Sequence, residues 1–128
     1  MVSLESSQIK WLNVSPDSSG QEILIVRVSW SPDGRAVICH VQNREQTWLE
    51  LVRADVTGGT KKTLIREASG AWINRLEDPI WLEDQSFLWL SERTGYQHVY
   101  RYSKEGRLLG AVTEGAWEVR KVAAVDER

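Results

Sequence analysis

Apolar and polar residues alternate or run in short bursts along this chain, and turn-forming residues bound each burst. This pattern is typical of β-strands, and no segment shows the stripe of a long amphipathic helix. We therefore expect an all-β protein with strands in two groups. The first group is Glu22–Trp30, Ala36–Val41, Thr47–Asp55 and Lys61–Glu67, and the second is Pro79–Leu82, Phe87–Ser91, His98–Ser103 and Leu108–Thr113.

The two groups of strands are copies of one unit. The two copies match at a shift of 51 positions through the first three predicted strands. At the fourth strand the shift is 48 positions, so the second copy is three residues shorter there, which fits a shorter final turn. Repeats of roughly 40 to 50 residues that hold four short strands are typical of propeller blades. The sequence thus predicts a fragment of a β-propeller with about two four-stranded antiparallel blades. A shift of 51 positions places Trp30 on Trp81, Asp33 on Asp84, Val37 on Leu88, Leu49 on Tyr100 and Leu51 on Tyr102.

Flanking strands extend this array at both ends of the chain. The blades are predicted at residues 22–70 and 71–117. Residues 1–21 are interpreted as a tail and the closing strand of a preceding blade, with that strand at Ile9–Val14. Residues 118–128 are interpreted as the first strand of a following blade. On this interpretation the chain begins and ends inside a longer array.

Charge and cysteine content exclude several classes of partner. The net charge is −2, both signs are interspersed, and no like-charge run is longer than Lys61-Lys62. This distribution argues against nucleic acid and against membrane contact by this segment. The single cysteine, Cys39, excludes an internal disulfide, and without a Cys or His cluster no structural zinc site is expected. We expect no metal and no cofactor.

Catalytic motifs are absent from the sequence, including Gly-x-Ser-x-Gly, His-Glu-x-x-His and a complete Walker A loop. Asp33 and Asp84 occupy the same turn in each copy, which predicts a turn-forming role, because an Asp side chain can bond backbone groups two residues on. His40 and His98 are interpreted as structural, and the seven Trp residues as packing between sheets. For Glu92 and Arg93, a surface ion pair and a contact between blades both remain open.

A run of short motifs carries a more specific resemblance. It includes Ser91-Glu92-Arg93-Thr94-Gly95-Tyr96-Gln97-His98-Val99-Tyr100, then Thr113-Glu114-Gly115-Ala116-Trp117-Glu118-Val119. In order and spacing these resemble the propeller of the dipeptidyl peptidase IV family, in the prolyl oligopeptidase clan of serine peptidases. The resemblance covers about residues 10 to 127. Its marker residues are Trp30, Asp33, Gly34, Trp72, Asn74, Ser91, Glu92, Gly95, Tyr96, His98, Tyr100, Gly115 and Trp117.

The resemblance implies a parent serine exopeptidase that removes N-terminal dipeptides with Pro or Ala in second place. In that family the catalytic triad belongs to a C-terminal α/β-hydrolase domain, and the propeller caps the active site and gates the entry of peptide substrates. A Glu pair that binds the substrate amine also belongs to the family's propeller, but this sequence contains no Glu-Glu step. We therefore predict a noncatalytic chain whose Glu pair and triad lie outside it. Only Arg75 is a candidate substrate-binding residue, with an exposed interblade position as its alternative.

A second function class also fits the strand pattern. The chain would then be part of a free-standing WD-like or TolB-like propeller module for protein binding or assembly, with no hydrolase attached. Under either interpretation, a fragment of about two blades exposes blade faces and strand edges, so we predict that the isolated chain self-associates. The sequence does not choose between a periplasmic, a secreted and a cytoplasmic parent.

Overall fold

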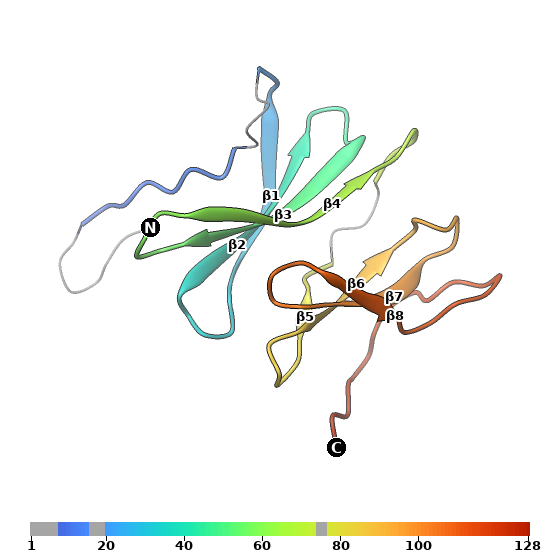
Figure 1. Ribbon diagram of the computed structural model, residues 1–128. Helices are drawn as coiled ribbons and strands as arrows, with labels where there is room; N and C mark the ends of the chain where they lie inside the picture. The colour runs from blue at the N-terminus through green and yellow to red at the C-terminus, as the bar shows by residue number, and fades with distance from the viewer. Residues whose placement is uncertain (1–7, 16–19, 74–76) are drawn as a thin grey trace. The chain divides into compact units, whose positions relative to one another are not determined.

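The computed structural model describes residues 8–15, 20–73 and 77–128. The chain divides into two compact units, Met1–Ile73 and Asn74–Arg128. Each unit contains one four-stranded antiparallel sheet in which consecutive strands are neighbours, β1-β2-β3-β4 in the first and β5-β6-β7-β8 in the second (Figure 1). No helix occurs in the described residues. The all-β fold and the two four-stranded blades are as predicted.

The strand positions agree with the hydrophobic pattern to within two residues at every end. This agreement arises because runs of strand-forming apolar residues stop where turn-forming residues begin, and the sheet ladder stops there too. The strands are β1 (Ile23–Trp30), β2 (Ala36–Asn43), β3 (Trp48–Asp55), β4 (Lys61–Ala68), β5 (Ile80–Trp81), β6 (Phe87–Ser91), β7 (His98–Tyr102) and β8 (Leu108–Ala111).

One face of the first sheet carries a small apolar core. Cys39 and Val41 of β2 and Val52 and Ala54 of β3 are buried together with Val14, which precedes the sheet in sequence. Leu12, Ile23, Val37 and Trp48 pack around this cluster. Cys39 is therefore a small core residue, and its burial raises the pKa of the thiol.

The second sheet is held by aromatic side chains. Phe87 of β6 stacks on Tyr102 of β7 with 5.5 Å between ring centroids and an interplanar angle of 12°. Trp81 of β5 lies 4.9 Å from Phe87 at a tilted angle. Since Phe87 and Tyr102 are directly opposite in the β6–β7 ladder, this is a cross-strand pair that fixes register as well as burying area.

The turn between the first two strands has the same backbone in both units. The Gly34 amide donates to the Ser31 carbonyl, and the Gln85 amide donates to the Leu82 carbonyl, each at 2.9 Å. Gly34 has φ of 66° and Gln85 has φ of 67°. Both pairs of residues are separated by 51 positions, so the sequence repeat is also a repeat of backbone conformation.

The predicted flanking strands are not formed as paired strands in the described residues. Residues 118–128 contain no strand, and within 9–14 only Ile9 forms an isolated bridge. A β-strand is stabilised by the ladder with its neighbour, and the eight strands of the two sheets supply no ladder to either segment. The interpretation of residues 118–128 as the first strand of a following blade stays a prediction.

The first unit ends at Ile73, whereas the sequence predicted the second blade to start at residue 71. The Ile73 amide donates to the Gln46 carbonyl at 3.0 Å, and the Ser69 amide donates to the Thr47 carbonyl at 2.8 Å. These bonds hold the residues after β4 against the β2–β3 turn, which is why they belong to the first unit.

Candidate functional site

The two strongest sequence signatures meet at one buried imidazole. His98, the first residue of β7, is 2% exposed. Its Nδ1 lies 3.0 Å from Thr113 Oγ1, and its Nε2 lies 2.9 Å from the Gly115 carbonyl oxygen. The Trp117 ring meets the imidazole edge-on, with 5.2 Å between centroids. We call His98, Thr113, Gly115 and Trp117 the His98 cluster.

The hydrogen bonds of the His98 cluster specify one tautomer. The Gly115 carbonyl can only accept, so Nε2 carries the proton and donates to it. Nδ1 then accepts from the Thr113 hydroxyl, and the same hydroxyl oxygen accepts from the Val99 amide at 3.0 Å. Every polar group in this chain of bonds is satisfied with a neutral imidazole. Both ring nitrogens of His98 are thus engaged within the second unit.

Gly115 is placed where a side chain does not fit. Its φ is 130°, and a Cβ atom added to it would lie 2.5 Å from Nε1 of Trp117. Contacts below 3.0 Å are not tolerated by real Cβ atoms, so any larger residue would displace the Trp117 ring. Because Gly115 has no Cβ, the Trp117 indole can lie against the Gly115 backbone and still contact His98.

The chain beyond Trp117 is fastened back onto the second unit. The Val119 amide donates to the Gln97 carbonyl at 2.8 Å, and the Gln97 side chain donates to the Val119 carbonyl at 2.7 Å. Further on, the Glu127 carboxylate accepts from the Glu83 amide at 2.9 Å. Residues 119–127 are therefore tied down at both ends although they form no strand.

The remaining marker residues of the second unit surround the turn between β6 and β7. The Gly95 amide donates to the Glu92 carbonyl, and Gly95 has φ of 91°, which closes a tight turn. Ser91 is buried and its hydroxyl accepts from the Arg93 Nε at 3.1 Å. Glu92 and Tyr96 are exposed.

Arg93 contacts aromatic side chains within its own unit. Its guanidinium carbon lies 4.2 Å from the ring centroid of Tyr100, and its Nη2 donates to the hydroxyl of Tyr102. A guanidinium over an aromatic face gains from the ring quadrupole. These contacts of Arg93 lie within one blade. They are distinct from the surface ion pair and from the contact between blades, the two roles that the sequence left open.

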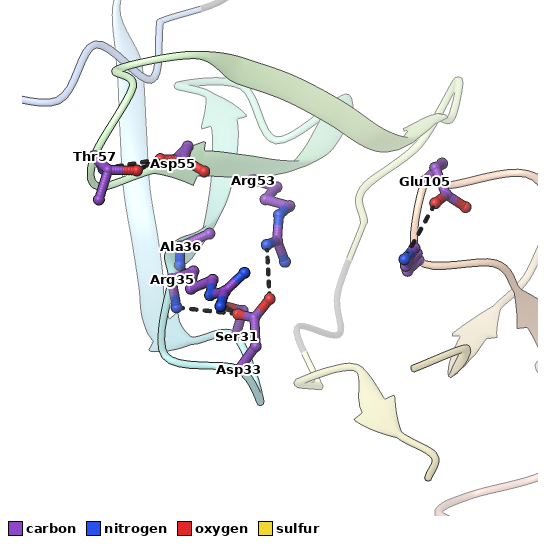
Figure 2. Close-up of polar contacts among 9 residues, drawn as sticks. Ser31, Asp33, Arg35, Ala36, Arg53, Asp55, Thr57 and Glu105 are labelled. Atoms are coloured by element: carbon purple, nitrogen blue, oxygen red, sulfur yellow. Dashed lines mark hydrogen bonds and ion pairs between the residues drawn. The ribbon is translucent and has the colours of Figure 1, made fainter. Parts of the chain in front are cut away.

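Asp33 and Asp84 make matching contacts in the two units. Asp33 accepts from the Arg35 amide at 3.0 Å and from Arg53 at 3.2 Å, as Figure 2 shows. Asp84 accepts from the Ser86 amide at 2.9 Å and from Arg101 at 2.6 Å. Each carboxylate thus bonds the backbone two residues on, as the turn interpretation expects, and also reaches an arginine on the third strand.

These contacts lower the pKa of both carboxyl groups. Hydrogen bonds from the Ser31 hydroxyl and the Arg35 amide, helped by Arg53, bring the pKa of Asp33 down to about 2. The Ser86 hydroxyl and amide, with Arg101, lower the pKa of Asp84. Donors that point at a carboxylate stabilise its charged form. Both groups are ionised at neutral pH and act as fixed acceptors.

Arg53 and Arg101 were missed by the sequence analysis. Both lie on the third strand of their sheet, β3 and β7. They do not match in the repeat, because a shift of 51 positions sets Arg53 on Lys104 and Glu50 on Arg101, so the repeat gave no signal for these contacts. A second missed contact is the ion pair between Glu50 and Arg66, at 2.5 Å. Glu50 is buried and directly opposite Arg66 in the β3–β4 ladder, so the pair neutralises a charge inside the sheet.

The other predicted residues do not gather into a site. Trp30 and Trp72 are more than half exposed, and their packing between sheets stays a prediction. Asn74 and Arg75 lie outside the described residues. Among the described residues, no three His, Cys, Asp or Glu side chains come together as metal ligands. The same residues include no helix of the length and apolarity needed to cross a membrane.

Comparison with known proteins decides which family has this arrangement. A family model for the dipeptidyl peptidase IV (DPP IV) N-terminal region matches residues 1–128. The chain belongs to this family. Among its relatives, dipeptidyl peptidase 4 of Arthroderma otae is 28% identical over 84% of the chain, and a probable dipeptidyl peptidase 4 of Trichophyton verrucosum is 30% identical over 82%.

Solved structures show the same fold. The crystal structure of Porphyromonas gingivalis dipeptidyl peptidase 4 matches 98% of this chain with a TM-score of 0.87 at 18% identity, over 18% of its own length. A putative dipeptidyl aminopeptidase IV from Bacteroides ovatus matches 94% with a TM-score of 0.76 at 17% identity, over 20% of its own length. The DPP IV family chain is thus a β-propeller segment, and it spans about 15% of the length of the curated relatives that it matches.

Proposed function

We propose that this chain is a noncatalytic part of the propeller of a dipeptidyl peptidase IV-like serine exopeptidase. Its role is to cap the active site of the parent enzyme and to restrict entry to short or unstructured peptide ends. The parent removes N-terminal dipeptides with Pro or Ala in second place. Its catalytic residues belong to a C-terminal α/β-hydrolase domain, which is the partner of this segment.

One observation carries the proposal. The entire chain matches the N-terminal region of the family, while relatives named dipeptidyl peptidase 4 are several times longer. The local structure supports a scaffold role, because the marker residues His98, Gly115, Asp33 and Asp84 are engaged in contacts within their own blades.

Arg75 is the proposed substrate contact of this segment. A guanidinium offers a fixed fork of donors, which suits a peptide carbonyl. In the parent enzyme, Arg75→Ala should raise KM for a dipeptidyl substrate with a smaller change in kcat, because the contact holds the substrate before and during the reaction. Unchanged KM would assign Arg75 to an exposed interblade position instead.

The reading frame of the source gene around residues 1–128 tests the family role. A downstream α/β-hydrolase pattern with Gly-x-Ser-x-Gly supports the exopeptidase proposal. Blades alone, without a hydrolase, would select a free-standing WD-like or TolB-like module and overturn it.

A separate assay tests whether the propeller restricts access to the active site of the parent enzyme. The parent enzyme should cleave a chromogenic Xaa-Pro substrate and an unstructured peptide, but not a folded protein with the same first two residues. Equal cleavage of the folded protein would refute the capping role and leave the peptidase assignment standing.

We also propose that the isolated chain self-associates. Large apolar side chains are exposed on both units, among them Ile25, Val28 and Trp30 in the first and Leu109 and Val112 in the second. Apolar surface of this kind is usually covered by a partner. Sedimentation equilibrium that shows only monomer up to high micromolar concentration would contradict this proposal.

A further inference from the structure

Among the residues that the structure describes, no strand lies beside the outer edge of β1. β1 is the first strand of its sheet and forms a ladder with β2 alone among the strands that the structure describes (Figure 1). Its backbone groups on the other side therefore meet no neighbouring ladder. An open edge of this kind is a template for pairing with another chain.

The other outer strands carry features that discourage such pairing. β4 is charged at Lys61, Lys62, Arg66 and Glu67, β5 has two residues, and β8 has four residues that include Gly110. β1 has eight residues, no Pro or Gly, and one charged side chain, Arg27. Charges and short length are the usual protection of sheet edges, so β1 is the least protected edge of this chain.

An apolar strip lies along the same strand. In the β1–β2 ladder, Ile25 is opposite Val41, Val28 is opposite Cys39 and Trp30 is opposite Val37. Residues directly opposite each other share a face, so these three side chains continue the face of the buried core. The bulge between Ile25 and Arg27 is what brings Ile25 and Val28 to one face. The exposed fractions are 51% for Ile25, 60% for Val28 and 56% for Trp30.

We propose that β1 pairs antiparallel with β1 of a second copy of this chain. This inference rests on the self-association proposed above and assigns it to one edge. With Val26 as the extra residue of the bulge, one symmetric register sets Val28 against Val28 of the copy and Ile25 against Trp30 of the copy. In that register these three apolar residues share one face, and Arg27 lies opposite Ser29 instead of opposite Arg27 of the copy.

The edge is small, so the association is weak. Eight residues of strand bury less than a standard interface of about 1,600 Å², and a dissociation constant in the micromolar range or above is expected. The test therefore uses the 128-residue chain from about 1 µM to about 1 mM, a range that brackets such a constant.

Amide hydrogen exchange measures the protection of backbone amides at the β1 edge directly in the unmodified chain. Amides of β1 that point away from β2 should become more protected as the concentration rises, whereas outward amides of β4 should not change. Protection of β1 that does not depend on concentration would overturn the pairing of β1 with a second copy.

A matched pair of variants gives an independent test by sedimentation equilibrium. Val28→Lys places a charge on the strip and should raise the dissociation constant by at least about tenfold, since the substitution occurs twice in the symmetric pair. Val112→Lys replaces a valine that is 56% exposed outside β1 and should leave the constant unchanged. Circular dichroism establishes that both variants fold.

The outcomes separate the two proposals. Pairing through the β1 edge is supported if the unmodified chain associates, Val28→Lys abolishes the association and Val112→Lys does not. Association that survives Val28→Lys overturns the role of β1 and leaves self-association standing. A chain that is monomeric throughout the range overturns both, and the assignment to the exopeptidase family is unaffected.

Discussion

Single residues of the His98 cluster explain why two distant sequence signatures occur together. Thr113 and Gly115 bond the imidazole, and Trp117 covers its edge. In each contact a residue of the second signature, residues 113–119, touches His98 of the first signature, residues 91–100. The sequence identified His98, Gly115 and Trp117 as markers. Periodicity and turn chemistry gave no indication that they meet, because the contact depends on how the chain turns back after β8.

The fit between Gly115 and Trp117 gives the first prediction. Gly115→Ala should destabilise the chain by about 2 kcal/mol, because the new Cβ displaces the indole and the φ of 130° is strained for alanine. In a Trp117→Ala background the same change should cost about 1 kcal/mol, since only the strain remains. Urea unfolding of the four proteins measures the coupling, and equal costs in both backgrounds would contradict the contact.

Backbone conformation at Gly34 can be tested without any change in packing. Gly34→Ala should cost about 1 kcal/mol, because φ is 66° and nothing lies within 4 Å of the added Cβ. Gly70→Ala is the control, because it also meets open space but has no positive φ. Equal unfolding free energies for the two variants would show that the left-handed turn is not a constraint in solution.

Strands and turns were the part of this protein that the sequence predicted best. The eight strands lie where alternation and turn residues indicated, and Asp33 and Asp84 bond the backbone as a turn role requires. The links from these carboxylates to Arg53 and Arg101 were not foreseen, because they join a turn to a strand that is a neighbour only after the sheet has formed. The interpretation of residues 118–128 as the first strand of a following blade stays a prediction, since a strand is stabilised by the ladder with its neighbour.

The Asp33 contacts predict a pH dependence of stability. The pKa of Asp33 is about 2 in the folded chain against an ordinary value of 3.8, so its contribution is fully present above about pH 4 and is lost as the pH falls through 2. Asp33→Asn should therefore reduce the free energy of unfolding at pH 7 and have little effect at pH 2. The effect is smaller than for a buried group, because the side chain is 37% exposed and partly screened.

Urea unfolding across this pH range makes the comparison, and Glu118→Gln serves as the control at an exposed carboxylate. The control should follow the unmodified chain at every pH. An Asp33→Asn curve parallel to that of the unmodified chain from pH 7 to pH 2 would show that the carboxylate contributes nothing to folding.

At the scale of the whole molecule, the chain holds two four-stranded propeller sheets and belongs to the family of the DPP IV N-terminal region. The family match covers every residue, and the relatives extend well beyond the segment that it matches. The contacts that could be mistaken for chemistry, at His98 and at the two turn carboxylates, are internal to each blade. These facts support the proposal that this segment is scaffold and that the chemistry lies elsewhere in the parent.

Turnover of a chromogenic Xaa-Pro substrate tests this division most directly. The 128-residue chain and the complete product of its source gene are assayed side by side at equal molar concentration, with a serine-directed inhibitor as the control for the mechanism. The account predicts no turnover by the chain and inhibitor-sensitive turnover by the complete product. Turnover by the chain alone, or an inactive complete product, would contradict it.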